Sequence, residues 1–379
     1  MLTDVFEFHA FCLTATGTRL DQYARALEQA VTPGAIVLDV GSGSGILAFM
    51  ASRLGARHVY AVEEHPQAIG LGARLAKSLG LSDRVTFITG SIFDLAPTER
   101  ADVVVADIHG PFGLQEGGFS ALADAHARWL KPGGALIPQA IELLVAPVEA
   151  PDLYARRVDV WRRTVHGVAL DPIRALAVNC AYGSRFRAAD LLSPTASLAQ
   201  TPLGTGAAAR LRGRSEFTAV RRGTLHGICG AMRSTLAAGI TLCNAPGDDE
   251  TTEFACAFLP VDEPVAVEAG DQIVIEVTAH DGAEFRWVVD VATRRAGSMR
   301  FQHATLLSRP EGTDWFRRLS DSYKPRLTQK SELELALASQ FDGTRTAADL
   351  DTWLADRWPD GMAAQARSRL LKAAIERFG

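Results

Sequence analysis

Residues 35–45 read AIVLDVGSGSG, a mostly apolar run that is followed by glycine at every second position: Gly41, Gly43 and Gly45. The run is typical of a buried parallel strand, and the next segment, ILAFMASRLG (46–55), is typical of a helix. Glycines at such a junction let the backbone approach a ligand, and the free N–H groups of the helix start favour negative charge. The spacing is weak for a dinucleotide, because Ile46 stands where G-x-G-x-x-G needs its third glycine.

The same alternation of strand and helix continues on both sides of this stretch. Helical spacing is found at 20–31, 66–79 and 118–130, apolar runs at 58–63, 85–89 and 101–107, and a turn signal at 131–134. Strands that alternate with helices indicate a parallel sheet covered on both faces. We therefore predict an α/β, Rossmann-like domain over residues 1–139, with the N-terminal helices included.

After residue 140 the sequence becomes rich in short strands without helices between them. These runs are IELLVAPV (141–148), SEFTAV (215–220), ACAFLP (255–260), QIVIEVTAH (272–280) and FRWVVDVA (285–292). They predict an antiparallel β-barrel domain over 140–310. Over 311–379 three amphipathic segments predict a small helical domain, with Ser331 and Thr346 as N-caps.

Composition excludes several classes of protein. Lys plus Arg is 39 and Asp plus Glu is 44, a formal charge of −5, so nucleic acid is not the expected partner. The five cysteines never form C-x-x-C, which argues for a reducing compartment and against a disulfide framework. The N-terminus does not resemble a signal peptide and no run is apolar enough to cross a membrane, so we expect a soluble cytoplasmic protein. The histidines show no metal-ligand spacing, and no metal is expected.

Two carboxylates accompany the glycines. Glu63 ends the second strand about 20 residues further on, where a carboxylate can accept hydrogen bonds from ribose hydroxyls; the alternative is a solvated strand-end acid. Asp39 lies inside the apolar strand and needs partners if it is buried. It would either orient the glycine loop or contact the ligand directly.

This combination resembles the class I S-adenosylmethionine-dependent methyltransferases, with VLDVGSGSGIL as the first motif and HVYAVE as the second. The resemblance implies S-adenosylmethionine as the cofactor and an acid on its ribose. The predicted cofactor-binding residues are Arg19, Asp39, Gly41, Gly43, Gly45, Glu63, Glu64, Ser91 and Ile92.

A second pair of acids follows the fourth strand, in the segment ADIHGPFGLQEGG. Asp107 and Glu116 are nine positions apart, on a loop expected to overhang the cofactor crevice. Converging carboxylates would suit a cation such as guanidinium, which presents its donors in a planar fork. The alternative is two solvated loop acids.

The loop is similar to that of the protein arginine N-methyltransferase family, S-E-W-M-G-x-x-L-x-x-E. In this alignment Asp107 takes the first glutamate, His109 the methionine and Glu116 the second glutamate. The family's T-H-W loop falls on 252–254, with Glu253 at the histidine, and Arg19 and Tyr23 fit its R-T-x-x-Y helix, whose arginine meets the methionine carboxylate.

The resemblance implies a divergent, bacterial-type member that methylates a guanidinium nitrogen of a protein or peptide. It also implies a homodimer, with a helical dimerisation arm at about 180–200. Asp107, Glu116, His109 and Glu253 are the predicted catalytic residues. The C-terminal segment is similar to helical or winged-helix modules of some bacterial modification enzymes.

The departures from the family pattern leave alternatives open. Asp107 is one methylene shorter than glutamate, and Glu253 adds a third acid. His109 would be a substrate-facing base, a polar contact to a different acceptor, or a solvated loop residue. The same scaffold could therefore methylate histidine, another amine or a small molecule, or be a catalytically inactive scaffold that binds the cofactor.

Overall fold

A computed structural model describes residues 17–114, 117–204, 210–248, 252, 254–280, 284–310, 317–318, 320–357 and 364–378. The chain forms two compact units, Met1–Pro310 and Glu311–Gly379. The predicted boundary between residues 139 and 140 lies inside the first unit and stays a prediction.

A parallel five-stranded sheet forms the first part of unit 1, as the sequence predicts. Its strands, in the order β3-β2-β1-β4-β7, are β3 (Val85–Thr89), β2 (His58–Glu63), β1 (Ile36–Val40), β4 (Ala101–Ala106) and β7 (Leu130–Ile137). All five residues of β1 are buried, which explains its nearly continuous apolar sequence. The chain leaves β1 toward β2 on one side and reaches β4 on the other, so the strand order reverses between β1 and β4. In open α/β sheets, ligands bind at the carboxyl ends of the strands at such a point.

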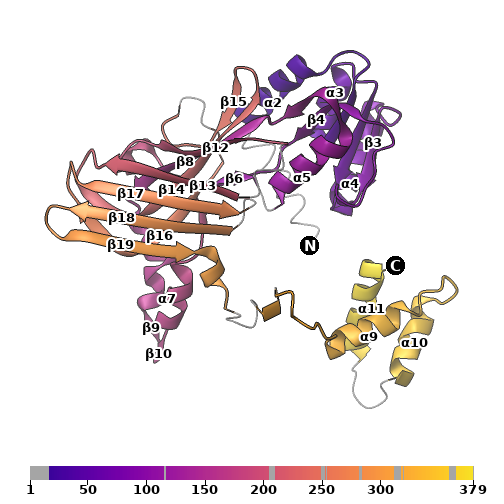
Figure 1. The fold of residues 1–379 in the computed structure, drawn as a ribbon. Helices are drawn as coiled ribbons and strands as arrows, with labels where there is room; N and C mark the ends of the chain where they lie inside the picture. Colours follow the sequence, from indigo (N-terminus) through magenta and orange to yellow (C-terminus); the bar gives the residue numbers. More distant parts are fainter. Residues whose placement is uncertain are drawn as a thin grey trace. The chain divides into compact units, whose positions relative to one another are not determined.

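Helices pack beside the parallel sheet (Figure 1). They are α2 (Gly17–Ala30), α3 (Ile46–Arg53), α4 (Pro66–Leu79) and α5 (Gly118–Asp124), the last continued by the π-helical turn Ala125–Trp129. The predicted turn at 131–134 is wrong, because these residues lie within β7. Gly133, at φ 77°, and a register shift against β4 allow this irregular stretch to join the sheet.

The second part of unit 1 is an antiparallel β domain, which confirms the predicted change of architecture. Its larger sheet has the order β11-β16-β14-β8-β12, with β15 paired to β14; the smaller has the order β13-β17-β18-β19. The strands of the larger sheet are β8 (Ala140–Val148), β11 (Tyr182–Ser184), β12 (Ala196–Pro202), β14 (Gly223–Ala237), β15 (Ile240–Cys243) and β16 (Cys256–Val267). Those of the smaller are β13 (Arg210–Thr218), β17 (Gln272–His280), β18 (Glu284–Thr293) and β19 (Gly297–Ala304).

The helical excursion of this domain lies earlier than predicted. Residues 180–200 contain β11, one 3-10 turn (Ala188–Asp190) and part of β12, so the expected helical arm at 180–200 is wrong. The helices are α6 (Pro151–Arg157) and α7 (Asp171–Ala177), with the turn Asp159–Arg162 and the short strands β9 (Thr164–Val165) and β10 (Val168–Ala169) between them. Proline within the first turn of α6 and α7 starts each helix, because its missing N–H is not needed there.

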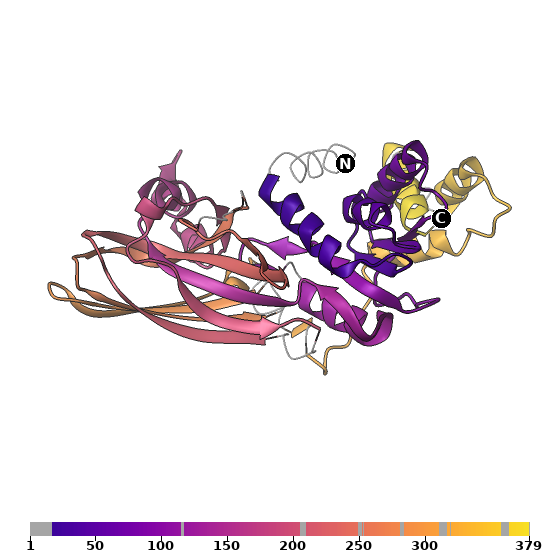
Figure 2. The same ribbon diagram turned by 90° about the horizontal axis from the view of Figure 1, so that it is seen from above.

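Helix α2 joins the two parts of unit 1. It contacts α3 on one side and strands β14 and β15 on the other, and Figure 2 shows it beside the junction of the two parts. Its Tyr23 and Leu27 are fully buried. Residues on the inner face of α2 are therefore placed where the parallel sheet meets the β domain.

Unit 2 contains α9 (Gln329–Ala338), α10 (Ala347–Arg357) and α11 (Ala364–Phe378), close to the three predicted helices. Its own apolar core includes Leu337, Leu354 and Leu371. The N-cap of α9 is Thr328 rather than Ser331, whereas Thr346 accepts the Asp349 N–H as predicted. Among the described helices of the chain, none combines the length and the apolar character that a membrane crossing requires.

Candidate active site

The glycine loop connects β1 to α3 at the carboxyl edge of the parallel sheet. Gly41, Gly43 and Gly45 have φ values of 68°, 55° and 86°, which are strained for other residues. A Cβ at Gly45 would lie 2.7 Å from Phe87 Cζ, and one at Gly41 would lie 3.0 Å from Ile108 Cγ2. Both backbone conformation and space therefore require glycine in this loop.

Asp39 is buried in β1 and its two oxygens have different surroundings. Oδ2 accepts a hydrogen bond from Ala48 N at 3.1 Å, which fixes the start of α3. Oδ1 is buried and has no hydrogen-bond partner within the described part of the chain. Burial raises the pKa of Asp39 to about 7, against the lowering effect of the Ala48 hydrogen bond and with a further increase from the charge of Glu63. Asp39 thus orients the loop and keeps one oxygen for another donor.

Glu63, at the end of β2, is held by backbone donors. Its Oε2 accepts from Gly43 N at 3.0 Å and its Oε1 from His65 N at 2.9 Å. Each carboxylate oxygen has two lone pairs, so both can still accept from a ligand hydroxyl. The carboxylate is therefore tied to the glycine loop and oriented by it.

The other predicted cofactor residues follow the same edge. Glu64 is exposed directly after β2, and Ser91 and Ile92 follow β3 by two and three residues. The Ile92 carbonyl accepts from Arg128 Nη2 at 2.6 Å, which anchors this segment to the helical turn before β7.

Asp107 directly follows β4, beside the end of β1. Its Oδ2 forms an ion pair with Arg19 of α2, and its Oδ1 lies 3.2 Å from His109 Nδ1. The Asp107 side chain is only 12% exposed, so the alternative of a solvated loop acid is wrong for this residue. The structure thus brings together Arg19, Asp107 and His109, three of the predicted residues.

His109 lies in the short strand β5 (His109–Gly110), which pairs with β6 (Gly113–Leu114). Its side chain is 1% exposed, so the solvated-loop alternative is wrong here too. Its Nδ1 lies 3.4 Å from the Tyr23 hydroxyl, which donates to Ala106 O at 2.7 Å. Burial, and next the positive charge of Arg19, lower the pKa of His109 to about 3, so the ring is neutral.

Two of the predicted catalytic residues, Glu116 and Glu253, lie outside the described residues. Phe254, next to Glu253, is described: the Arg19 guanidinium carbon lies 5.3 Å from its ring centroid, a cation–π contact. This contact brings the segment after β15 to the same arginine that Asp107 binds.

Asn244, which the sequence indicates only as part of a turn, connects the two segments. Its Nδ2 donates to Pro111 O and to Ala255 O, both at 2.9 Å, and its Oδ1 accepts from Met232 N at 2.7 Å. It is buried, and its amide hydrogens join the loop after β4 to the segment before β16. Asparagine before Ala-Pro-Gly is common in turns, so nothing in the sequence alone distinguishes this role.

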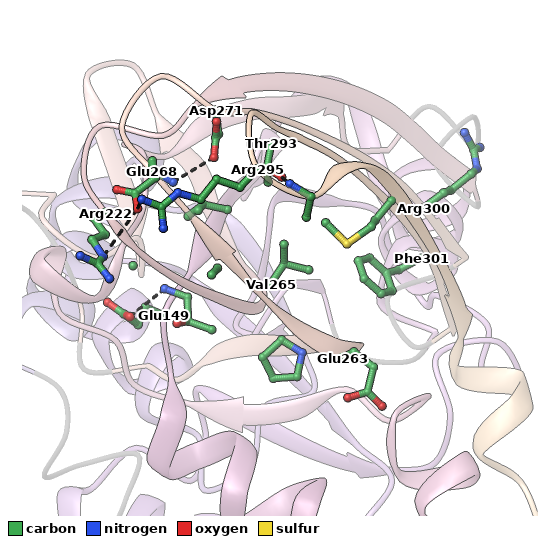
Figure 3. Close-up of a pocket in the computed structure, with 17 residues that line it drawn as sticks. Glu149, Arg222, Glu263, Val265, Glu268, Asp271, Thr293, Arg295, Arg300 and Phe301 are labelled. Atoms are coloured by element: carbon green, nitrogen blue, oxygen red, sulfur yellow. Dashed lines mark hydrogen bonds and ion pairs between the residues drawn. The ribbon is translucent and has the colours of Figure 1, made fainter.

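A pocket of about 900 Å³ opens elsewhere, in the β domain (Figure 3). Val265 of β16 and Phe301 of β19 lie toward its middle, and at its rim Glu268 lies 3.7 Å from both Arg222 and Arg295. None of the predicted site residues that the structure describes lines it. The candidate active site is therefore the carboxyl edge of the parallel sheet and not this pocket.

A family model described as ribosomal protein L11 methyltransferase (PrmA) matches residues 20–141, the region of the parallel sheet. The chain is 33% identical over 188 residues to a probable protein arginine N-methyltransferase 6 of Arabidopsis thaliana, covering 47% of this chain and 43% of that protein. It is 29% identical over 282 residues to protein arginine N-methyltransferase 6 of Xenopus tropicalis, covering 70% of this chain and 82% of the relative.

Two solved structures share the fold. Arabidopsis thaliana protein arginine methyltransferase 10, in an open conformation, has a TM-score of 0.66 at 21% identity and covers 80% of this chain and 100% of its own. The Trypanosoma brucei PRMT1 enzyme–prozyme complex with AdoHcy also has a TM-score of 0.66, at 19% identity, covering 76% of this chain and 95% of its own.

The parallel sheet, the glycine loop and the acid after β2 define a class I S-adenosylmethionine-dependent methyltransferase. The antiparallel β domain that follows is part of the fold shared with these two solved structures. In sequence the chain is similar to protein arginine N-methyltransferases, and it spans less than half the length of the first relative given above. That it is a bacterial-type member of that family stays a prediction.

Proposed function

We propose that this chain transfers the methyl group of S-adenosylmethionine to a guanidinium nitrogen of a protein or peptide. The observation that carries the proposal is the pairing of Asp107 with a guanidinium, that of Arg19, beside the glycine loop. A carboxylate that already binds one guanidinium in a mostly buried place has the chemistry to receive another.

The residues at the sheet edge fit the cofactor. The buried Oδ1 of Asp39, without a partner among the described residues, is suited to a positively charged or hydrogen-bond-donating group. Glu63 has lone pairs for the ribose hydroxyls, and Arg19, with five N–H donors, can meet the methionine carboxylate as well as Asp107. When bound, the cofactor supplies an electrophilic S-methyl group.

The role of the protein is to position the acceptor and to offset charge. Asp107 orients the acceptor nitrogen and accepts its released proton, and Glu116 holds and polarises the acceptor. The negative carboxylates reduce repulsion between a guanidinium and the sulfonium. Orientation of two reactants contributes roughly 7–11 kcal/mol to such reactions. We propose that Glu253 adds a third negative charge to the site that binds the methyl acceptor.

Two variants test the proposal. We expect Glu116→Gln to abolish turnover with nearly unchanged affinity for S-adenosylhomocysteine, because the acid acts on the acceptor. We expect Glu63→Ala to weaken cofactor binding, measured by calorimetry. Full activity of Glu116→Gln would refute its assignment, and unchanged affinity of Glu63→Ala would remove Glu63 from the ribose site.

A second candidate is methylation of a different acceptor: histidine, another amine or a small molecule. The buried, neutral His109 beside Asp107, at the position of the family's methionine, favours it. Radiolabelled methyl transfer to a cell lysate separates an enzyme from an inactive scaffold, and mass spectrometry of the labelled product then identifies the acceptor.

We also propose that the chain forms a homodimer. The excursion over 151–177 exposes apolar side chains, among them Val165, Val168 and Ile173, the second 61% exposed. Analytical ultracentrifugation tests this; a monomer at all concentrations would contradict it. The cytoplasmic location stays a prediction.

A further inference from the structure

We propose that His109 binds the methyl acceptor: its Nε2 accepts a hydrogen bond from an N–H of the acceptor, while Asp107 and Tyr23 hold the ring with its proton on Nδ1. The inference rests on the proposed function and adds a recognition contact to it. It follows from the hydrogen-bonding capacities of the groups around the ring.

The surroundings of Nδ1 assign the tautomer. The Tyr23 hydroxyl gives its single hydrogen to Ala106 O at 2.7 Å, so it presents a lone pair to Nδ1 at 3.4 Å. The second neighbour, Asp107 Oδ1 at 3.2 Å, belongs to a carboxylate that is ion-paired with Arg19 and can only accept. Both neighbours of Nδ1 are acceptors, so Nδ1 carries the hydrogen.

Nε2 is then a bare acceptor. The strongly lowered pKa of His109, caused mainly by burial, agrees with a neutral ring that carries a single proton. Nε2 is buried and has no hydrogen-bond partner in the segments that the structure describes. Buried polar atoms of this kind are nearly always satisfied, by protein, water or ligand. The missing partner must therefore be a donor.

The position of His109 points to the acceptor as that donor. His109 follows Asp107 by two residues at the carboxyl edge of the sheet, and Ile108 between them lies against Gly41 of the glycine loop. In the proposed complex, the carboxylate of Asp107 accepts hydrogen bonds from N–H groups of the methyl acceptor. Nε2 of His109 accepts one further N–H hydrogen bond from the same molecule. A guanidinium has five N–H donors, enough to bind both the carboxylate and Nε2. A methyl acceptor without an additional N–H group would leave Nε2 without a hydrogen bond.

The tautomer can be measured directly in the full-length protein. Long-range ¹H–¹⁵N spectra of ¹⁵N-histidine-labelled protein, with His109 assigned by the signal lost in His109→Gln, separate the two tautomers and the charged ring. We expect a neutral ring protonated at Nδ1 at neutral pH. A proton on Nε2, or a charged ring, would overturn the inference even if methyl transfer is active.

The donor is identified by titration of the same sample. With S-adenosylhomocysteine present, we expect methylguanidinium ion to shift the Nε2 resonance saturably. Absence of that shift, or the same shift on addition of S-adenosylhomocysteine alone, would overturn the inference. Failure of S-adenosylhomocysteine to bind at all would instead count against the proposed function.

Two substitutions provide the kinetic test. His109→Met removes the acceptor atom, and we expect it to raise KM for the labelled lysate acceptor by about tenfold or more, with unchanged S-adenosylhomocysteine affinity. His109→Gln keeps an acceptor oxygen near the position of Nε2 and should recover part of this loss. Equal KM values for both variants and the wild type would contradict the role of Nε2.

Discussion

The two halves of the candidate site are built differently. The half that we propose for the cofactor is held by the backbone: Glu63 accepts from Gly43 N, and Asp39 accepts from Ala48 N. The half that we propose for the methyl acceptor is held by side chains from distant segments, with Arg19 and Tyr23 of α2 around Asp107 and His109. Backbone contacts constrain spacing and glycine content, whereas side-chain contacts can be exchanged one residue at a time. This difference accounts for a glycine loop that follows the methyltransferase motif and a loop after β4 that departs from the arginine methyltransferase pattern.

The largest effect is expected in the acceptor half, from Asp107→Asn. The substitution removes the negative charge that pairs with Arg19 and that we propose binds the guanidinium of the substrate. We therefore expect kcat/KM to fall by about a hundredfold or more. Steady-state methyl transfer measures this. The matched control is Asp290→Asn, which removes an exposed ion pair with Arg300 and should leave activity unchanged. Equal activities of the two variants would show that Asp107 does not serve the acceptor.

In the cofactor half, Gly45→Val should mainly weaken S-adenosylhomocysteine binding. The valine side chain would clash with Phe87, and the backbone at this position has a φ of 86°, which is strained for valine. We therefore also expect the free energy of unfolding to fall by roughly 1–3 kcal/mol. Calorimetry and denaturant unfolding measure the two effects. As a control, Gly70→Ala in α4 has open space and should keep affinity and stability or slightly increase stability. Unchanged affinity in Gly45→Val would mean that the loop does not approach the cofactor.

A smaller effect on turnover is expected from Asn244→Ala. Loss of the hydrogen bonds to Pro111 O and Ala255 O should loosen the acceptor half, lowering kcat by about tenfold with unchanged cofactor affinity. Asn179→Ala is the matched control, because Asn179 is also buried and bonds Ala175 O and Ala304 N far along the chain from the loop. Both variants should lose about 1–3 kcal/mol of stability, but only the first should lose activity.

The smallest effect on activity is expected from Asp39→Asn, which keeps the shape of the side chain. This variant instead tests how the free energy of unfolding depends on pH. Because the folded-state pKa is raised from 3.8 to about 7, the folded protein binds more protons than the unfolded chain in this interval, and stability falls as pH rises through it. The slope is at most about 1.4 kcal/mol per pH unit. Denaturant unfolding of the cofactor-free protein should show a flatter profile for the variant; parallel profiles would contradict a raised pKa.

The parallel sheet could be predicted because each of its first four strands is a compact apolar run beside a glycine or an acid. Strand β14, at 15 residues the longest of the described strands, cannot be predicted from local sequence, since GTLHGICGAMRSTLA mixes glycines with polar residues. Its pairing with β8 and β16 on both sides stabilises it regardless of local preference. The predicted helical arm is wrong for a similar reason: the last seven residues of the Ala- and Leu-rich segment 188–202 form strand β12, which pairs with β8.

In the site, the position of Asp107 could be predicted from the end of a strand, because carboxyl ends of parallel strands share one edge. The burial of His109 could not, because it depends on Tyr23, 86 positions earlier in the chain. Asn244 could not be found either, since its partners lie on segments separated from it by 133 and 11 positions. Long-range side-chain contacts leave no local periodicity to detect.

Helix α2 sets a limit on how this enzyme can be shortened. The family model begins at residue 20, yet Arg19 lies before that limit and Asn244 lies far beyond its end at residue 141. A fragment trimmed to residues 20–141 would retain the glycine loop and Glu63 and would lose both Arg19 and Asn244, which hold the proposed acceptor site from its two ends. Transfer of the proposed acceptor site to another scaffold would therefore require helix α2, the parallel sheet and the β domain together.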